Sequence, residues 1–500
     1  MSKKSLIGCN RIVFWAIGLM HCVPFTAFAN DEENQRNIIF VLSDDHRFDF
    51  MSCVEGCPDF LKTPNMDFMA SKGALIKNAF VSTSLCSPSR ASILTGQYMH
   101  HHQVVDNQRA VPEGTRFFPT QLQKLGYQTA FVGKWHMGHE NDDPRTGFDH
   151  WASFRGQGTY YNPTLNINGE RKQFEGYTTD ILTDHAIQWL ENRDSQDPYC
   201  LYLSFKAVHY PFQPAPRNLG KFADMTIDYP ETMANTERNY QTQPHWVRNR
   251  RFSIHGIDHM ETGAFDKDPV PSFDDLYHQY AECVVGIDEN LGRVLDWLRK
   301  NQRDKNTIVI YMGDNGFELG EHGFYDKRDA FEHSIRVPML AYAPGLIEPG
   351  TQVEQMVQNI DIAPTLLEVA GAGQELVSEM KMDGQSFLGL INGEPPRAWR
   401  DHILYEYHWE WNFPATPTTL AIRTNRFKYI YYHGIWDHNG FYDLKTDPLE
   451  RHNLLNVPAY QEQIQQLQRQ MFSEFQLSGG LNLPIRIPKG DRLDQRKLNR

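Results

Sequence analysis

Short apolar runs alternate with amphipathic segments between Asn37 and Asp314, a pattern typical of a doubly wound α/β fold. Apolar runs predict strands at residues 38–42, 129–132, 199–205 and 307–312. Two of these runs are continuously apolar, as in strands that helices cover on both faces. Hydrophobic stripes of helical period predict helices over residues 178–192 and 274–300. We therefore predict a large, mostly parallel, doubly wound sheet.

The pattern changes after residue 391, where short strands follow one another without intervening helices. Strands are predicted at residues 403–407, 420–423, 429–432 and 440–444, and a helix at 460–475. This indicates a smaller C-terminal α+β subdomain. We expect a catalytic domain over residues 30–395 and a C-terminal subdomain over 396–500, with an antiparallel sheet, a helix and a basic tail.

Residues 1–29 have the pattern of a signal peptide. Lys3, Lys4 and Arg11 are basic, residues 12–19 are apolar, and residues 27–29 (A-F-A) fit a cleavage site. An uncleaved N-terminal anchor is the alternative. No later run approaches the length of a membrane span. We expect an exported protein, periplasmic or secreted, with no membrane partner in its mature form.

Composition and cysteine content narrow the range of functions. The chain has 49 Lys+Arg against 62 Asp+Glu, a net charge of −13, which argues against a nucleic-acid partner. Hydrophobic residues at 40% and aromatic residues at 12% indicate a large core and exclude disorder. Cys200 and Cys283 lie in apolar patterns and are expected in the core. The sequence leaves open whether Cys53 and Cys57 form a disulfide. Cys86 lies in a different pattern, which is described below.

Polar residues follow all four predicted strands of the large sheet. They are Asp44 and Asp45 after the first, Lys134 and His136 after the second, His209 after the third, and Asp314 and Asn315 after the fourth. Each alone could be a turn, capping or structural residue. Ligands of open α/β sheets bind beyond the carboxyl ends of the strands, so residues at four such ends predict one site.

Residues 86–96, C-S-P-S-R-A-S-I-L-T-G, predict a helix that begins near Cys86. Pro88 suits the first turn, and Gly96 suits the position after the end. Cys86 and Arg90 share one face, beside free N–H groups that favour an anion. Two readings follow from the residues alone: a low-pKa thiolate nucleophile, or a packing cysteine beside a structural arginine.

The same string resembles the signature of type I formylglycine-dependent sulfatases, in the alkaline phosphatase-like superfamily. Asp44-Asp45 and Asp314-Asn315 resemble the two metal-binding pairs of that family. Residues 133–138 (G-K-W-H-M-G), 208–211 (V-H-Y-P) and 320–323 (G-E-H-G) with Lys327 resemble its other motifs. Residues 96–107 and 313–328 look closest to N-acetylglucosamine-6-sulfatase-like glycan sulfatases.

This resemblance implies a cofactor, a modification and a substrate class. Cys86 would be converted to formylglycine by a maturation enzyme. Ca²⁺, in preference to Mg²⁺, would be held by Asp44, Asp45, Asp314, Asn315 and modified Cys86, and the oxygen ligands are hard donors that suit such ions. The expected substrate is a sulfated polysaccharide or its oligosaccharides, with a glycosaminoglycan and an algal polysaccharide such as ulvan both open.

The resemblance also implies roles for the polar residues. Arg90 and Lys134 would hold the formylglycine hydroxyls, and His136 would assist sulfate elimination. His209 and Lys327 would bind sulfate, and one of them would protonate the leaving alcohol. His322 is a further substrate-binding candidate that could instead only support the site.

Several alternatives stay open. A phosphodiesterase or phosphonate monoester hydrolase could use the same scaffold, and a non-enzymatic secreted glycan-binding protein would leave Cys86 as an ordinary thiol. The run His100-His101-His102 is expected at the surface or a pocket rim, since adjacent side chains point in different directions. The aromatic segment 407–411 could stack on carbohydrate or pack between the two parts of the chain. The long insertion 214–271 is expected to shape the pocket.

Overall fold

The computed structural model describes residues 35–193, 196–258, 272–484 and 492, which all belong to the unit Gln35–Arg500. The predicted signal peptide lies outside the described residues. Among the helices of the described part, none combines the length and the apolar character that crossing a bilayer requires.

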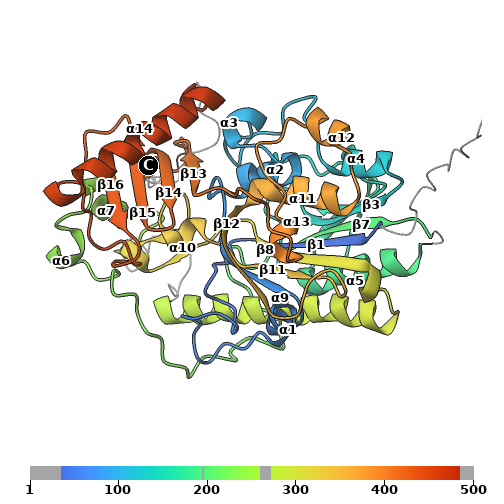
Figure 1. Cartoon of the computed structure of the whole chain (residues 1–500). Coiled ribbons are helices and arrows are strands. Elements are labelled where there is room, and N and C mark those ends of the chain that lie inside the picture. The colour runs from blue at the N-terminus through green and yellow to red at the C-terminus, as the bar shows by residue number, and fades with distance from the viewer. Residues whose placement is uncertain (1–34, 194–195, 259–271, 485–491, 493–500) are drawn as a thin grey trace, which may run out of the picture. The chain divides into compact units, whose positions relative to one another are not determined.

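A ten-stranded mixed sheet forms the centre of this unit, in the order β12-β2-β11-β8-β1-β7-β3-β4-β5-β6 (Figure 1). Its middle strands β8, β1, β7, β3 and β4 run parallel to one another. The four predicted strands are β1 (Asn37–Ser43), β3 (Gln128–Lys134), β7 (Tyr199–Ser204) and β8 (Thr307–Gly313). The others are β2 (Ala74–Phe80), β4 (His150–Phe154), β5 (Thr164–Ile167), β6 (Glu170–Gln173), β11 (Met339–Tyr342) and β12 (Thr351–Gln358). The prediction of a large, mostly parallel sheet is confirmed.

Helices cover both faces of this sheet (Figure 1). One face carries α1 (Pro64–Lys72), α5 (Thr178–Glu191) and α9 (Phe273–Lys300), and the other carries α2 (Cys86–Thr95), α4 (Pro119–Lys124), α11 (Ile362–Val369) and α13 (Leu388–Ile391). Ser272 caps the long helix α9 by accepting a hydrogen bond from Asp275 N. Both helices predicted from hydrophobic stripes, α5 and α9, are present.

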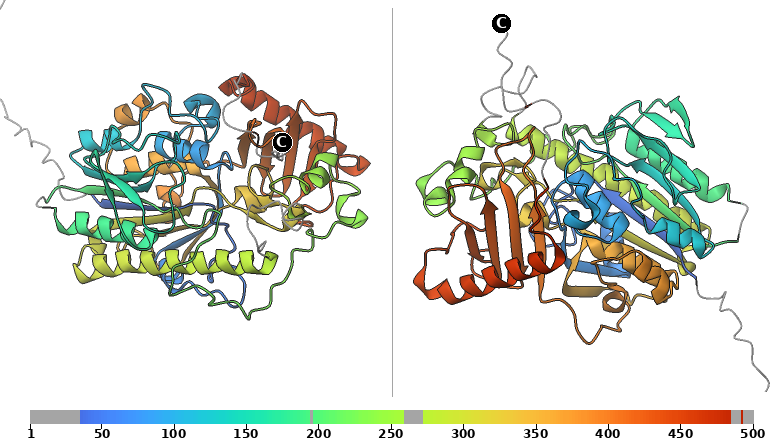
Figure 2. Two further views of the ribbon diagram at one scale, coloured as in Figure 1. Left: turned by 180° about the vertical axis from the view of Figure 1, so that it is seen from behind. Right: turned by 90° about the horizontal axis from the view of Figure 1, so that it is seen from above.

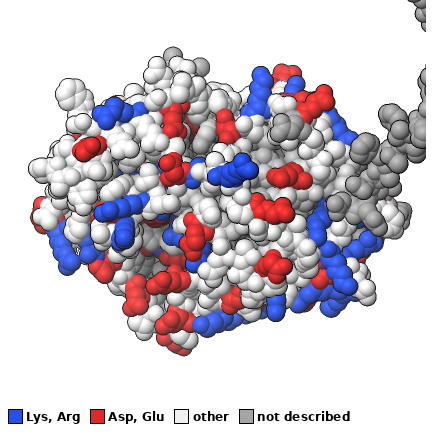
Figure 3. Space-filling view, in the orientation of Figure 1, with Lys and Arg blue, Asp and Glu red and all other residues white. Residues whose placement is uncertain are grey.

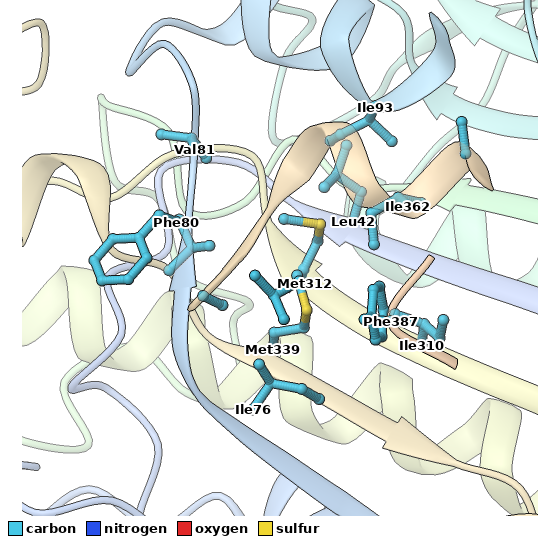
Figure 4. Packing of buried hydrophobic residues seen from close by; sticks show 14 of the residues in the cluster. Leu42, Ile76, Phe80, Val81, Ile93, Ile310, Met312, Met339, Ile362 and Phe387 are labelled. Atoms are coloured by element: carbon cyan, nitrogen blue, oxygen red, sulfur yellow. The ribbon is translucent and has the colours of Figure 1, made fainter. Parts of the chain in front are cut away.

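Two hydrophobic cores result, because side chains alternate between the faces of a strand. In β1, Ile38, Phe40 and Leu42 belong to the core beneath α2 and α11, whereas Ile39 and Val41 belong to the core beneath α5 and α9. Figure 4 shows the first core, in which Leu42, Ile93, Met312 and Ile362 pack together. The predicted core cysteines Cys200 and Cys283 are buried, and Cys53 and Cys57 are free thiols.

The C-terminal part is a four-stranded antiparallel sheet with one long helix on its outer face (Figure 2). Its elements are β13 (His402–Tyr407), β14 (Thr418–Thr424), β15 (Phe427–His433), β16 (Gly440–Asp443) and α14 (Gln461–Ser478). The predicted strands and helix are therefore present, and the boundary at residues 395/396 stays a prediction. Glu406 N donates to Ser82 O at 2.9 Å, which joins β13 to the segment before α2.

Shorter elements connect these parts. They are α3 (Met99–His102), α6 (Glu237–Tyr240), α7 (His245–Arg250), α10 (Glu332–Ile335), α12 (Gln374–Glu379), and the two-stranded sheet of β9 (Glu318–Leu319) and β10 (Tyr325–Asp326). On the face shown in Figure 3, acidic and basic side chains are interspersed. Acidic side chains on that face are thus mixed with basic ones and do not form a separate acidic patch.

Candidate active site

The predicted site residues converge because their strands are parallel neighbours. Asp44 and Asp45 follow β1, and Asp314 and Asn315 follow the adjacent strand β8. Asp314 N donates to Ser43 O at 2.9 Å, and Asp45 N donates to the Asp314 carboxylate at 3.0 Å. All four residues are fully buried. The carboxyl ends of β1 and β8 therefore bring three carboxylates and one amide together, as predicted.

Helix α2 brings Cys86 to the same place. It begins at Cys86, and Gly96 ends it in the left-handed conformation, with φ of 70°. The Cys86 thiol donates to Asp44 Oδ1 at 3.3 Å and lies 3.9 Å from Asp45 Oδ1. Every residue of α2 is buried, so its polar side chains also face the protein interior.

Each of the three carboxylates has a cationic partner. Lys134 Nζ donates to Asp44 Oδ2, and Lys327 Nζ donates to Asp45 Oδ2 at 2.5 Å. Arg90 Nε donates to Asp314 Oδ2 at 2.9 Å, and Arg90 Nη1 donates to Lys134 O and to Ser204 Oγ at 2.7 and 2.6 Å. The bonds of Arg90 fix the position of Asp314 relative to β3 and β7.

The surroundings of Cys86 decide between the two readings of its thiol. Burial and the neighbouring Asp44 carboxylate raise the Cys86 pKa well above its usual range. The side chain is therefore a protonated thiol that donates a hydrogen bond, although it begins a helix. This environment favours the thiol over the low-pKa thiolate, and a thiol is a weaker nucleophile than a thiolate.

The pKa values of Asp44 and Asp314 are shifted in opposite directions. Burial alone would raise the Asp44 pKa, but Lys134 and Arg90 lower it to about 2. Burial, together with the charge of Asp44, raises the Asp314 pKa to about 7 in spite of Arg90. Three carboxylates thus face three cationic side chains, and at Asp314 the effects of burial and of the Asp44 charge outweigh that of Arg90. A divalent cation at this place would favour the ionised form of Asp314.

The donor set fits a hard divalent cation. Ligand atoms of Asp44, Cys86 and Asp314 lie within 4.8 Å of one another. Asn315 Nδ2 donates to Asp45 Oδ1 at 2.7 Å, which leaves Asn315 Oδ1 buried without a hydrogen-bond partner among the described residues. A free amide oxygen beside three carboxylates is suited to Ca²⁺. The predicted set of metal ligands stays a prediction.

The two predicted histidines of the site are neutral. Burial and the charge of Lys134 lower the His136 pKa well below its usual range, and both ring nitrogens lack hydrogen-bond partners in the described part of the chain. Burial and Lys327 lower the His209 pKa similarly. His209 Nδ1 bonds to Tyr210 O at 2.5 Å, and its Nε2 lies 3.9 Å from Asp45 Oδ2. Since a carbonyl only accepts, Nδ1 carries the proton and Nε2 has a free lone pair.

His322 does not join this cluster. Its ring stacks on Phe331 with centroids 4.0 Å apart, and its backbone bonds to Thr232 and Tyr240. Among the described residues, no hydrogen bond or ion pair connects its ring with Asp45 or Lys327. The geometry fits the supporting role for His322 better than substrate binding.

The histidine run departs from its prediction as a surface or rim feature. His100 is buried and bonds to Glu406 Oε1 at 2.9 Å, and buried His102 bonds to Ser92 Oγ at 3.1 Å. Only His101 is largely exposed, where it pairs with Asp383 at 2.7 Å. The prediction was wrong for His100 and His102 because α3 packs between α2 and β13, which buries two of the three side chains.

The aromatic segment 407–411 was expected either to stack on carbohydrate or to pack within the chain, and most of it packs within the chain. Tyr407 and Glu410 are buried, and Glu410 accepts hydrogen bonds from Tyr407 and from Arg328, the residue after Lys327. Trp409 remains 37% exposed. Packing against the segment of Lys327 explains the polar members, whereas partly exposed Trp409 contacts Pro414, Thr418 and Trp411 within its own part of the chain.

Sequence reasoning missed two polar partners of the site. Gln157 Oε1 accepts from Lys134 Nζ at 2.5 Å, and buried Lys206 lies 4.6 Å above the Tyr160 ring. Burial lowers the Lys206 pKa to about 8. Gln157 stands in a loop without a motif, whereas Lys206 follows β7 directly and could have been found by the rule that located His209.

Comparison with known proteins now adds a family. Residues 36–372 match the model described as sulfatase, and residues 320–476 match that described as N-sulphoglucosamine sulphohydrolase, C-terminal. The chain is 33% identical to an N-acetylglucosamine-6-O-sulfatase of Bacteroides thetaiotaomicron, over 95% of this chain and 93% of the relative. It is 29% identical to the human N-acetylglucosamine-6-sulfatase, over 77% of this chain and 70% of the relative.

Solved structures show the same fold. A protein in complex with its substrate D-glucosamine-2-N,6-O-disulfate superimposes with a TM-score of 0.79 at 31% identity, over 89% of this chain and 98% of that chain. The phosphonate monoester hydrolase of Agrobacterium radiobacter gives a TM-score of 0.68 at 20% identity, over 90% and 96%. At that identity the second similarity concerns the fold alone. The predicted alkaline phosphatase-like architecture is confirmed.

Proposed function

The chain belongs to the sulfatase family and is a sulfuric ester hydrolase, and on this premise we propose that it removes sulfate from a sulfated glycan. The relative named as an N-acetylglucosamine-6-O-sulfatase matches over nearly the whole of both chains. A structural relative binds a glucosamine with 2-N and 6-O sulfates. A 6-O-sulfated glucosamine unit of a polysaccharide or oligosaccharide is therefore the proposed substrate.

The observation that carries the mechanism is the position of buried Cys86, whose thiol contacts Asp44 beside two further carboxylates and an amide oxygen that has no partner among the described residues. We propose that Cys86 is converted to formylglycine, whose hydrate supplies a hydroxyl nucleophile that a thiol does not. We also propose that Asp44, Asp45, Asp314, Asn315 and the modified residue hold Ca²⁺, which supplies a positive charge opposite sulfate oxygens. Asn315 Oδ1, which has no hydrogen-bond partner among the described residues, and the three carboxylates beside it support this cation.

The cationic residues orient the nucleophile. Arg90 and Lys134 lie on the side of the site formed by β3 and β7, within reach of Asp44. They are proposed to hold the hydroxyls of residue 86. Neutral His136, with both ring nitrogens unpartnered, can accept the proton of the second hydroxyl when sulfate is eliminated.

Lys327 and His209 are proposed to bind the sulfate group. The Asp45 carboxylate holds the Lys327 ammonium at 2.5 Å, and His209 Nε2 faces the same carboxylate. A sulfate anion at this position would add its charge beside His209 and favour the imidazolium. One of these two residues then protonates the leaving alcohol.

Three further proposals complete this description. The signal-peptide pattern of residues 1–29 supports export to the periplasm or beyond the cell. The catalytic domain is proposed to cover residues 30–395, and the C-terminal subdomain 396–500. A formylglycine-generating enzyme would act on Cys86 before the protein is active.

The test compares sulfate release from glucosamine substrates sulfated at O6 with release from those sulfated at O3 or at nitrogen. The protein is co-expressed with a maturation enzyme, and mass spectrometry of the Cys86 peptide measures the conversion. We expect conversion of Cys86 and preference for the 6-O-sulfate. A strong preference for aryl phosphodiesters over aryl sulfates would contradict the proposal, as would activity with unmodified Cys86.

A further inference from the structure

A buried carboxylate outside the active-site cluster has no hydrogen-bond partner in the described part of the chain. Glu318, in β9, is fully buried, and neither of its oxygens has a hydrogen-bond partner among the described residues. In contrast, Asp44, Asp45 and Asp314 each contact a cationic side chain. An unpaired buried carboxylate is costly unless a proton or a cation neutralises it.

Two metal-ligating side chains stand next to Glu318. Ligand atoms of Glu318, Glu321 and His333 lie within 4.8 Å of one another. His333 Nε2 lies 3.8 Å from Glu321 Oε1. Burial lowers the His333 pKa, so its imidazole is in the neutral form that binds metals.

We propose that Glu318, Glu321 and His333 form a second divalent-cation site, distinct from the proposed Ca²⁺ site, that takes a transition-type ion such as Zn²⁺. Zn²⁺ binds both imidazole nitrogen and carboxylate oxygen, whereas Ca²⁺ prefers oxygen alone. The unpartnered Glu318 is the principal ligand because both of its oxygens are available.

Arg47 does not close this site. It donates to Glu321 Oε1 at 2.8 Å and to Oε2 at 3.2 Å, and the backbone N–H of Leu319 also occupies Oε2. Oε1 thus accepts a single hydrogen bond and keeps a second lone pair. Arg47 also forms two bonds with Asp49, at 2.6 and 2.7 Å, so its charge is shared between two carboxylates.

The site has a route to solvent. Glu321 and His333 both line a cavity of about 540 Å³, together with Arg47, Asp49 and Tyr277. Glu318 does not line this cavity, but its carboxylate lies next to Glu321 and His333. An ion would enter from this cavity and displace the proton that otherwise neutralises Glu318, whose pKa burial and Asp329 raise well above its usual range.

A bound ion would brace the segment that carries the catalytic residues. Gly316 N and Phe317 N donate to Ser334 O and His333 O at 2.9 and 2.8 Å, so β9 and α10 already adjoin. The segment from Asn315 to Lys327 passes through β9. Joining Glu318 and Glu321 to His333 through a metal would hold the first part of that segment, next to Asn315, against α10.

The experiment is a Zn²⁺ titration of the full chain by calorimetry. The protein is first freed of metal with a chelator and then saturated with Ca²⁺, so that the proposed calcium site is filled. We expect one tight Zn²⁺ per chain in the wild type. Glu318→Gln and His333→Ala should each weaken Zn²⁺ binding by at least about tenfold, since even outer-shell changes cost this much.

Two controls separate this site from other histidines and from the active site. His433→Ala removes an exposed imidazole of β15, and Cys86→Ala alters only the proposed calcium cluster, so both should keep the Zn²⁺ affinity. Zn²⁺ should also raise the melting temperature of the wild type and not that of Glu318→Gln. The proposal is wrong if Ca²⁺-saturated wild type takes up no stoichiometric Zn²⁺, or if Glu318→Gln binds Zn²⁺ as the wild type does. Because Glu318→Gln is nearly isosteric, it keeps the test valid should His333→Ala misfold.

Discussion

The metal-free protein should lose stability as its Asp314 carboxyl ionises. Burial and Asp44 raise the Asp314 pKa from 3.8 to about 7, so the folded state binds this proton more tightly than the unfolded state. Stability from this group is fully present below pH 3.8 and is lost as the pH rises towards 7. The difference between the two pKa values corresponds to about 4 kcal/mol in total.

Asp314→Asn isolates this contribution, because asparagine has a similar shape and does not ionise. We expect the free energy of unfolding of the metal-free wild type, relative to Asp314→Asn, to fall by about 2 kcal/mol between pH 5 and pH 7. Urea unfolding at each pH, followed by circular dichroism, measures this difference. Asp224→Asn, at an exposed position, is the matched control and should parallel the wild type.

Calcium supplies the second half of the test. An ion that binds ionised Asp314 stabilises the folded state by an amount that grows with its affinity. Ca²⁺ should therefore raise the unfolding free energy of the wild type more at pH 8 than at pH 5, and should have little effect on Asp314→Asn. Parallel pH curves for the wild type and Asp314→Asn in the absence of metal would refute this reasoning.

Three other variants test separate parts of the structure. Cys86→Ala should abolish sulfate release from an aryl sulfate and leave the circular dichroism spectrum unchanged; residual turnover would contradict the nucleophile. Lys327→Met should lower kcat/KM by about 100-fold or more, as loss of a transition-state charge contact does, and steady-state kinetics with normal constants would exclude Lys327 from sulfate binding. Glu406→Gln weakens a charge-assisted hydrogen bond to His100 and should lower the free energy of unfolding by about 1–3 kcal/mol, with kcat of the folded enzyme unchanged. Urea unfolding measures this difference. An unaltered unfolding curve would show that other contacts hold α3.

The sequence was most informative where local pattern and topology agree. Short apolar runs located β1, β7 and β8, and parallel pairing made the residues after them neighbours. Asp44, Asp314 and His209 could therefore be grouped without knowledge of the structure. Cys86 was placed by its own helix, because Pro88 and Gly96 marked the two ends of α2.

Side-chain direction and long-range packing were not predictable in this way. His322 belongs to a motif, yet its residue has φ of 52° and its ring stacks on Phe331. His100 and His102 are buried by β13, which lies some 300 residues further along the chain. Glu318 is flanked by apolar Phe317 and Leu319, and only the folded arrangement shows that its carboxylate has no hydrogen-bond partner among the described residues.

The burial of Cys86 means that its proposed modification has to precede the completion of folding. The Cys86 side chain is fully buried. The segment before α2 is joined to β13 by the hydrogen bond that Glu406 N donates to Ser82 O. An enzyme that modifies Cys86 must therefore reach it before this packing is complete. Glu406 follows Cys86 by roughly 320 residues, which take about 15–60 s to synthesise at ribosomal rates. If Cys86 is modified as proposed, that interval is the period in which the growing chain would offer the thiol to a modifying enzyme, and conversion delayed beyond it would leave folded molecules with an unmodified Cys86.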